Sequence, residues 1–170
     1  PSLPVQRAMA DGLDPIPWLV MLPLAWGTLA FVLGPGRGAR LAITALVLQN
    51  ALALQLAAQL FEGGARRYAV GGWGAPLGID LFADGLAATM LLLTQAVALP
   101  LAVYARGYFS AHAKGATLFW PMTGMLLAAL NALFLAADLF NLYVTLELLG
   151  LAAVGLVAIA GGRAPVAAAL

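Results

Sequence analysis

Long stretches without a charged residue dominate the sequence. A helix rises about 1.5 Å per residue and the hydrocarbon core of a bilayer is about 30 Å thick, so about 20 apolar residues are enough to cross a membrane. The stretches that approach or exceed this length are 16–33, 41–61, 85–105, 115–137 and 139–160, the last interrupted only by Glu147. We therefore expect an all-α integral membrane protein with about five transmembrane helices.

The polar segments between these stretches set the expected organisation. We expect an external N-terminal segment over residues 1–15, two helices over 16–61, an external loop over 62–84, and three helices with the start of a sixth over 85–170. The glycine-rich run 34–38, with Pro35 and Arg37, predicts a tight basic turn between the first two helices. The glycines and Pro76 of the long loop favour turns and predict a short hairpin, with Trp73 as an anchor at headgroup level.

The two ends of the chain suggest a piece of a larger protein. The sequence begins at Pro1 and not at a methionine, and residues 167–170 look like the beginning of another helix. We therefore expect a fragment.

Composition narrows the class of protein further. The chain is 64% hydrophobic and 9% charged, which excludes a water-soluble globule, and its net charge of +1 gives no field to attract nucleic acid. It has no cysteine and a single histidine, His112, in a basic loop. This inventory removes thiolate zinc sites, iron–sulfur clusters and haem held by two histidines, so we expect neither a metal nor a cofactor.

The basic residues fall unevenly on the two sides of the expected helices. Alternating loops place Arg37, Arg40, Arg106, Lys114 and Arg163 on one side. The opposite side carries Arg7, Arg66 and Arg67 together with Asp11, Asp14, Glu62, Asp80, Asp84 and Asp138. Because short cytoplasmic loops are richer in Lys and Arg, we expect the N-terminus to lie outside.

Glu147 is the strongest candidate for chemistry. It is the ninth residue of its stretch, about 12 Å from the first along a helix axis, which places a carboxyl group near the bilayer midplane. An acidic residue there costs about 2.5–3.5 kcal/mol, and intramembrane ionisable residues are functional by default, so Glu147 is predicted to bind or relay a cation or proton. The alternative is a protonated structural acid that donates a hydrogen bond to a neighbouring helix. Tyr143 and Gly150 share its helix face and would support it through a hydroxyl and through close helix approach.

Two aspartates precede predicted helices and have two readings each. Asp84 and Asp138 are favoured as N-caps, which accept amide hydrogens of the first turn, or they form proton entry points at the outer mouth. Uncharged polar residues within the stretches are expected mostly to bond between helices, or else to line a proton path if they converge on Glu147. They are Gln49, Asn50, Gln55, Gln59, Thr89, Thr94, Gln95, Thr123 and Asn131.

Two segments carry a resemblance to a known family. Residues 71–79 with 83–86, and residues 134–147, are similar to the antiporter-like proton-conducting membrane subunits. This family includes the D subunit of the Mrp-type sodium/proton antiporters and the related subunits of complex I and of membrane-bound hydrogenases, and the Gly71-Gly72-Trp73 hairpin favours the Mrp branch. The likeness covers about residues 68–162, so the chain resembles an N-terminal portion.

The resemblance implies a function and a location. Glu147 would be the family's essential membrane glutamate, which pairs with a lysine on a later helix. The one lysine here, Lys114, lies in a loop, so such lysines would lie beyond Leu170. The implied function is proton conduction coupled to sodium antiport, in a multisubunit assembly of the bacterial inner membrane with other membrane subunits as partners. The alternative is a proton-pumping or structural subunit of a complex I-like oxidoreductase or hydrogenase, and in either case a translocating subunit is favoured over a catalyst.

Overall fold

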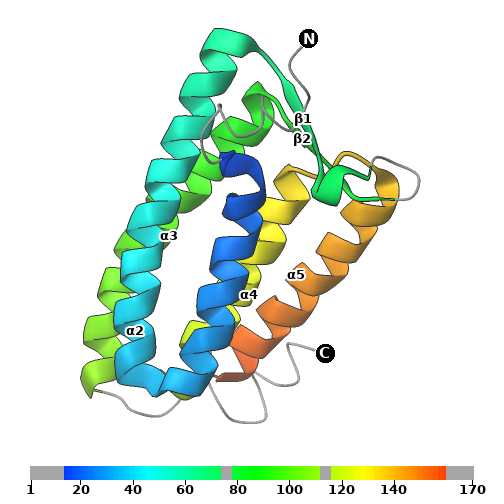
Figure 1. Cartoon of the computed structure of the whole chain (residues 1–170). Coiled ribbons are helices and arrows are strands. Elements are labelled where there is room, and N and C mark those ends of the chain that lie inside the picture. The colour runs from blue at the N-terminus through cyan, green and yellow to red at the C-terminus, as the bar shows by residue number, and fades with distance from the viewer. Residues whose placement is uncertain (1–13, 74–77, 112–115, 160–170) are drawn as a thin grey trace.

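The computed structural model describes residues 14–73, 78–111 and 116–159. Within these ranges four helices are long and apolar enough to cross a membrane. They are α2 (Pro15–Gly63), α3 (Gly85–Ala111), α4 (Ala116–Phe134) and α5 (Leu139–Ile159), and they pack side by side in one bundle (Figure 1). The expected start of a sixth helix, most of the N-terminal segment, His112 and Lys114 lie outside the described residues.

Helix α2 contains the first two expected crossings. Gly34 interrupts it with φ 75° and ψ 174°, and the segments 15–33 and 35–63 run in opposite directions (Figure 1). A side chain is strained at this positive φ, whereas glycine adopts it freely. Pro35 then begins the second segment, where its fixed φ suits a first helical turn. The predicted turn is confirmed but confined to Gly34, and α2 to α5 together supply the five expected segments.

A small β-hairpin joins α2 to α3. Strands β1 (Arg66–Ala69) and β2 (Asp80–Ala83) pair antiparallel, with Arg66 opposite Ala83 and Ala69 opposite Asp80. A 3-10 turn, η1 (Val70–Gly72), follows β1. The hairpin expected between the second and third spans is therefore present at one end of the bundle (Figure 1).

The second edge of β2 binds the connection between α4 and α5. The amide of Phe82 donates to the Leu135 carbonyl at 2.8 Å, and the amide of Ala137 donates to the Asp80 carbonyl at 3.3 Å. The fourth span was predicted to continue to Ala137, but α4 ends at Phe134. The prediction was wrong at this end because hydropathy does not distinguish an apolar helix from an apolar segment that pairs with a strand.

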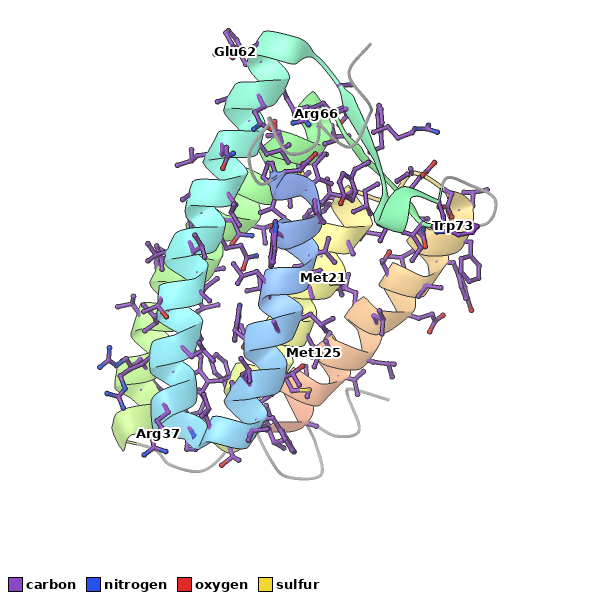
Figure 2. The ribbon with its side chains drawn as sticks, in the orientation of Figure 1. Met21, Arg37, Glu62, Arg66, Trp73 and Met125 are labelled. Carbon is purple, nitrogen blue, oxygen red and sulfur yellow. The ribbon has the colours of Figure 1, made fainter. Side chains whose placement is uncertain are left out.

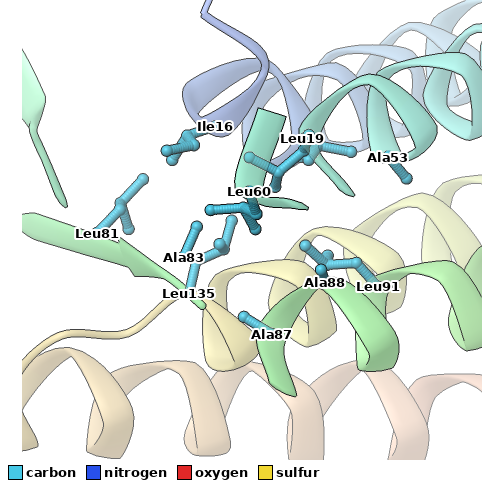
Figure 3. Close-up of a cluster of buried hydrophobic side chains, with 11 residues drawn as sticks. Ile16, Leu19, Ala53, Leu60, Leu81, Ala83, Ala87, Ala88, Leu91 and Leu135 are labelled. Carbon is cyan, nitrogen blue, oxygen red and sulfur yellow. The ribbon is translucent and has the colours of Figure 1, made fainter. Parts of the chain in front are cut away.

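Two apolar clusters form the core. The hairpin cluster lies near the β-hairpin and consists of Ile16, Leu19, Ala53, Leu56, Leu60, Leu81, Ala83, Ala87, Ala88, Leu91 and Leu135 (Figure 3). The turn cluster lies toward the Gly34 end and consists of Trp26, Ala30, Ala39, Ala42, Ala45, Leu46, Ala102, Ala105, Trp120 and Leu127. The turn cluster combines α2, α3 and α4. The hairpin cluster combines α2, β2, α3 and Leu135, which directly follows α4, so these elements form the packed part of the bundle.

Two glycines allow α2 and α4 to cross closely. A Cβ atom on Gly124 would lie 2.5 Å from the Cα of Gly27 and 2.9 Å from the carbonyl oxygen of Pro23. Small residues at such a crossing let helix backbones approach in a membrane, where packing drives association. In contrast, no described atom outside the neighbouring backbone lies within 4 Å of a Cβ built on Gly150. The close approach predicted at Gly150 therefore has no partner in the described part of the chain.

Candidate functional site

Asp138 starts the helix that carries Glu147. Its Oδ1 accepts a hydrogen bond from the Asn141 amide at 2.8 Å, its Oδ2 accepts from the Asn141 side chain, and its carbonyl accepts from the Leu142 amide at 3.0 Å. Asp84 acts in the same way at α3, accepting from the Ala87 amide at 2.8 Å. Each aspartate thus satisfies amides that a helix start leaves unpaired. The capping that the sequence favoured is present at both positions.

Glu147 points away from the rest of the bundle. On α5 the buried residues are Thr145 and Ala152, which face α4. Since successive helical residues are about 100° apart, Glu147 lies about 200° around the helix from Thr145. Its side chain is accordingly exposed. This carboxylate therefore lies on the face of α5 that the described chain leaves uncovered.

Tyr143 is the near neighbour of this carboxylate. It lies one turn earlier on the same face and is 63% exposed, and its hydroxyl lies within electrostatic range of the Glu147 carboxylate. The ion pairs among the described residues involve other acids, Arg66 with Asp14 at 3.1 Å and Arg67 with Asp80 at 3.5 Å. Within the described ranges, then, Glu147 has a phenol beside it and no cation.

The other charged residues of the described ranges lie near the two ends of the bundle. Glu62 and Arg66 lie at the hairpin end and Arg37 at the opposite end (Figure 2). Trp73 lies in the connection between β1 and β2, directly after η1, and is 67% exposed (Figure 2). No group of three or more acidic or histidine side chains that could hold a metal ion occurs within residues 14–73, 78–111 and 116–159. Glu147 thus stands alone between two charged ends.

The polar residues of the predicted spans do not converge on Glu147. Asn50, Thr89 and Thr123 bond to carbonyls four residues earlier in their own helices, and Gln59 binds Arg66 at the hairpin. The expectation of bonds between helices was wrong for Asn50, Thr89 and Thr123, because a carbonyl one turn earlier in the same helix is within reach. Gln49, Gln95 and Asn131 are fully buried, but they lie in the α2–α3–α4 part of the bundle.

The sequence of the chain is similar to those of known membrane subunits. No protein-family model matches the chain. The chain is 38% identical over 133 residues to NADH-quinone oxidoreductase subunit N of Desulforudis audaxviator, covering 78% of this chain and 26% of that relative. It is 32% identical over 112 residues to the Na(+)/H(+) antiporter D subunit of Alkalihalophilus pseudofirmus, covering 66% of this chain and 22% of that relative.

A solved structure has the same fold. A chain in the Mrp complex from Dietzia sp. DQ12-45-1b matches 92% of this chain and 30% of its own length, with a TM-score of 0.76 and 27% identity. The bundle is thus an integral membrane protein of the kind found as subunits in large membrane complexes. Its sequence and fold are similar to those of the antiporter-like membrane subunits, the family that its motifs resemble. The chain spans about a quarter of the length of the curated relatives it matches.

Proposed function

We propose that this chain is part of a membrane subunit that conducts protons, coupled to the antiport of a cation such as sodium, with Glu147 as the proton-binding group. The observation that carries the proposal is the carboxylate near the middle of an apolar helix, facing away from its own bundle. The relative from Alkalihalophilus pseudofirmus, named as the D subunit of a Na(+)/H(+) antiporter, supports antiport as the activity.

The position of Glu147 in an apolar helix sets what the carboxyl group needs around it. Near the centre of a bilayer a charged carboxylate is costly, so Glu147 gains from taking up a proton or from a partner that stabilises its charge. Tyr143 can donate one hydrogen bond to the charged form. A cationic side chain on another helix would stabilise it further, and moving that cation toward or away would change how tightly the proton is held.

The uncovered face of α5 requires a partner of matching chemistry. Leu139, Tyr143, Leu146 and Leu151 are all exposed along it, together with Glu147. Further helices of the same subunit, or other membrane subunits, would cover this face and line a path for protons to Glu147. The Mrp complex that contains a chain of the same fold supports a multisubunit assembly.

Charge distribution supports an orientation in the bacterial inner membrane. The hairpin end carries Asp14, Glu62, Asp80, Asp84 and Asp138 against Arg66 and Arg67, whereas the Gly34 end carries Arg37, Arg40 and Arg106. By the positive-inside rule the Gly34 end faces the cytoplasm and the N-terminus lies outside. In a cysteine-free background, a membrane-impermeant maleimide applied to intact cells should label Glu62→Cys and not Arg37→Cys. The reverse labelling would overturn this orientation.

A substitution that keeps shape and removes the titrating group tests the role of Glu147. Glu147→Gln in the native assembly should abolish proton transport driven by a sodium or potassium gradient in membrane vesicles, without lowering the amount of assembled subunit. Glu62→Gln is the matched control, since it makes the same change at an exposed position at the end of α2. Unchanged transport in the Glu147→Gln vesicles would sink the proposal.

A second candidate is a proton-pumping or structural subunit of a complex I-like oxidoreductase, favoured by the likeness to NADH-quinone oxidoreductase subunit N. If the chain pumps protons there, Glu147→Gln should lower the protons moved per electron transferred. If it is structural, the Glu147→Gln variant should leave the rates of proton transfer and electron transfer unchanged. Gly150→Leu should then disrupt assembly, because it would fill the space open beside α5.

A further inference from the structure

Three buried amide side chains lie at one level of the bundle. Gln49 follows Leu46 of the turn cluster by three residues and precedes Ala53 of the hairpin cluster by four. Asn131 on α4 lies in the same way, four residues after Leu127 of the turn cluster and four before Leu135 of the hairpin cluster, which directly follows the helix.

Gln95 occupies the equivalent place on α3. It follows Leu91 of the hairpin cluster by four residues and precedes Ala98, which packs against the turn cluster, by three. All three side chains, Gln49, Gln95 and Asn131, have no exposed surface. A polar layer thus separates two apolar clusters in the middle of the α2–α3–α4 bundle.

The hydrogen bonds in this layer are incomplete. Asn131 Nδ2 donates to the Leu19 carbonyl at 2.7 Å, and Gln95 Nε2 approaches Asn131 Oδ1 at 3.4 Å. Gln95 Oε1 and both polar atoms of Gln49 bond to no described residue. Two acceptors and one donor are therefore buried at the centre of a membrane-spanning bundle, where an unsatisfied polar group is costly and bulk water is absent.

The mixture of donor and acceptor decides which ligand fits. A sodium or potassium ion needs several oxygen ligands, would leave the Gln49 amide donor unpaired, and finds no carboxylate in this layer. Water both donates and accepts, and buried waters in proteins make about three hydrogen bonds to such groups. Water can therefore satisfy Gln95 Oε1 and both ends of the Gln49 amide.

We propose that Gln49, Gln95 and Asn131 enclose ordered water in the core of the α2–α3–α4 bundle. This hydration site is distinct from Glu147, because α4 lies between them. Asn131 on α4 bonds to Leu19 on α2, whereas Ala152 of α5 lines an apolar pocket with Ala128 and Ala132 of α4. The site does not depend on the proton-binding role of Glu147.

A single variant distinguishes a hydrated layer from a dry one, because it should change the unfolding temperature in opposite directions in the two cases. Gln49→Met removes no hydrogen bond between described residues, since both polar atoms of Gln49 are unpaired in them. In a dry layer it would remove two unsatisfied atoms and raise the thermal stability of the native assembly. In a hydrated layer it leaves the water and Gln95 Oε1 with fewer hydrogen-bond partners, and the unfolding temperature should fall by about 2–4 °C.

Gln55→Met is the matched control, because Gln55 is exposed on the same helix. It should leave the unfolding temperature unchanged. The measurement is repeated in sodium, potassium and choline chloride. A Gln49→Met effect that changes with the cation would show a cation site and overturn the proposal.

An experimental structure of the native assembly, at a resolution that shows water, decides the matter without a variant. Density about 2.7–3.2 Å from both Gln49 and Gln95 is the expected result. Direct pairing of the Gln49 and Gln95 amides, with no density between them, would overturn the proposal even if Gln49→Met failed to assemble.

Discussion

Thr145 and Glu147 lie two residues apart on α5 and face opposite ways. Thr145 is buried toward α4 and bonds to the Asn141 carbonyl at 2.8 Å within its own helix, whereas Glu147 is exposed beside Tyr143. The two residues divide α5 into a face that packs on this bundle and a face that carries the titratable group. If Glu147 binds protons as proposed, their path runs along the outer side of this bundle and not through its core.

Asp138 can be tested as a cap separately from any role in proton entry. Asp138→Ala removes the acceptor for the Asn141 amide, so the free energy of unfolding should fall by about 0.5–2 kcal/mol. Asp138→Ser keeps a capping oxygen without a charge and should restore most of this stability. If Asp138 is only a cap, proton uptake by Asp138→Ser vesicles equals that of the wild type. A loss of uptake in a stably capped variant would instead indicate a proton entry point.

The crossing of α2 and α4 should not tolerate a side chain at Gly124. Gly124→Ala places a Cβ 2.5 Å from the Gly27 Cα and should destabilise the bundle by about 1–3 kcal/mol through overpacking. Gly36→Ala is the control, since nothing lies within 4 Å of a Cβ at that position and its φ is not positive. The unfolding temperatures of purified assemblies measure the difference. Equal stability of the two variants would contradict the close crossing.

Of the two hairpin arginines, the more exposed one, Arg67, should contribute more to the free energy of unfolding. Arg66 pairs with Asp14, and both side chains are partly exposed, so Arg66→Met should cost about 1 kcal/mol or less. Arg67 is 64% exposed, but its partner Asp80 is buried, so Arg67→Met strips a buried carboxylate of its cation and should cost more. Thermal unfolding of both variants at low and high salt checks the order. A larger loss from Arg66→Met would contradict it.

Strand β2 should be the best protected part of the hairpin in hydrogen exchange. The Phe82 amide bonds to Leu135, and the strand pairs with β1 on its other edge. The amides of Gly71 and Gly72 take part in no such ladder, so they should exchange faster than the amides of residues 80–83. Exchange at the same rate would show that the hairpin opens as a unit and does not hold the α4–α5 connection.

Several features followed directly from local sequence. Charge-free stretches located all five segments because the length and hydropathy of a crossing are set by the bilayer. Gly34 and Pro35 located the first turn, and Asp84 and Asp138 located two helix starts, since a cap acts on amides within three residues. The likeness to antiporter-like subunits was also visible in two short segments, and the relatives and the Mrp structure confirm it.

What the sequence by itself determined is therefore short-range or one-dimensional: the spans, their caps and the single carboxyl group inside one of them. The tertiary structure decided which polar residues meet, because Gln95 and Asn131 lie 36 residues apart in the sequence and approach each other from different helices. It also decided that Gly27 and Gly124 form the close crossing, that β2 binds residues 135–137, and that Glu147 faces outward. Each of these depends on how one helix is rotated against another, and in a chain so uniformly apolar the sequence marks no face strongly enough to fix that rotation.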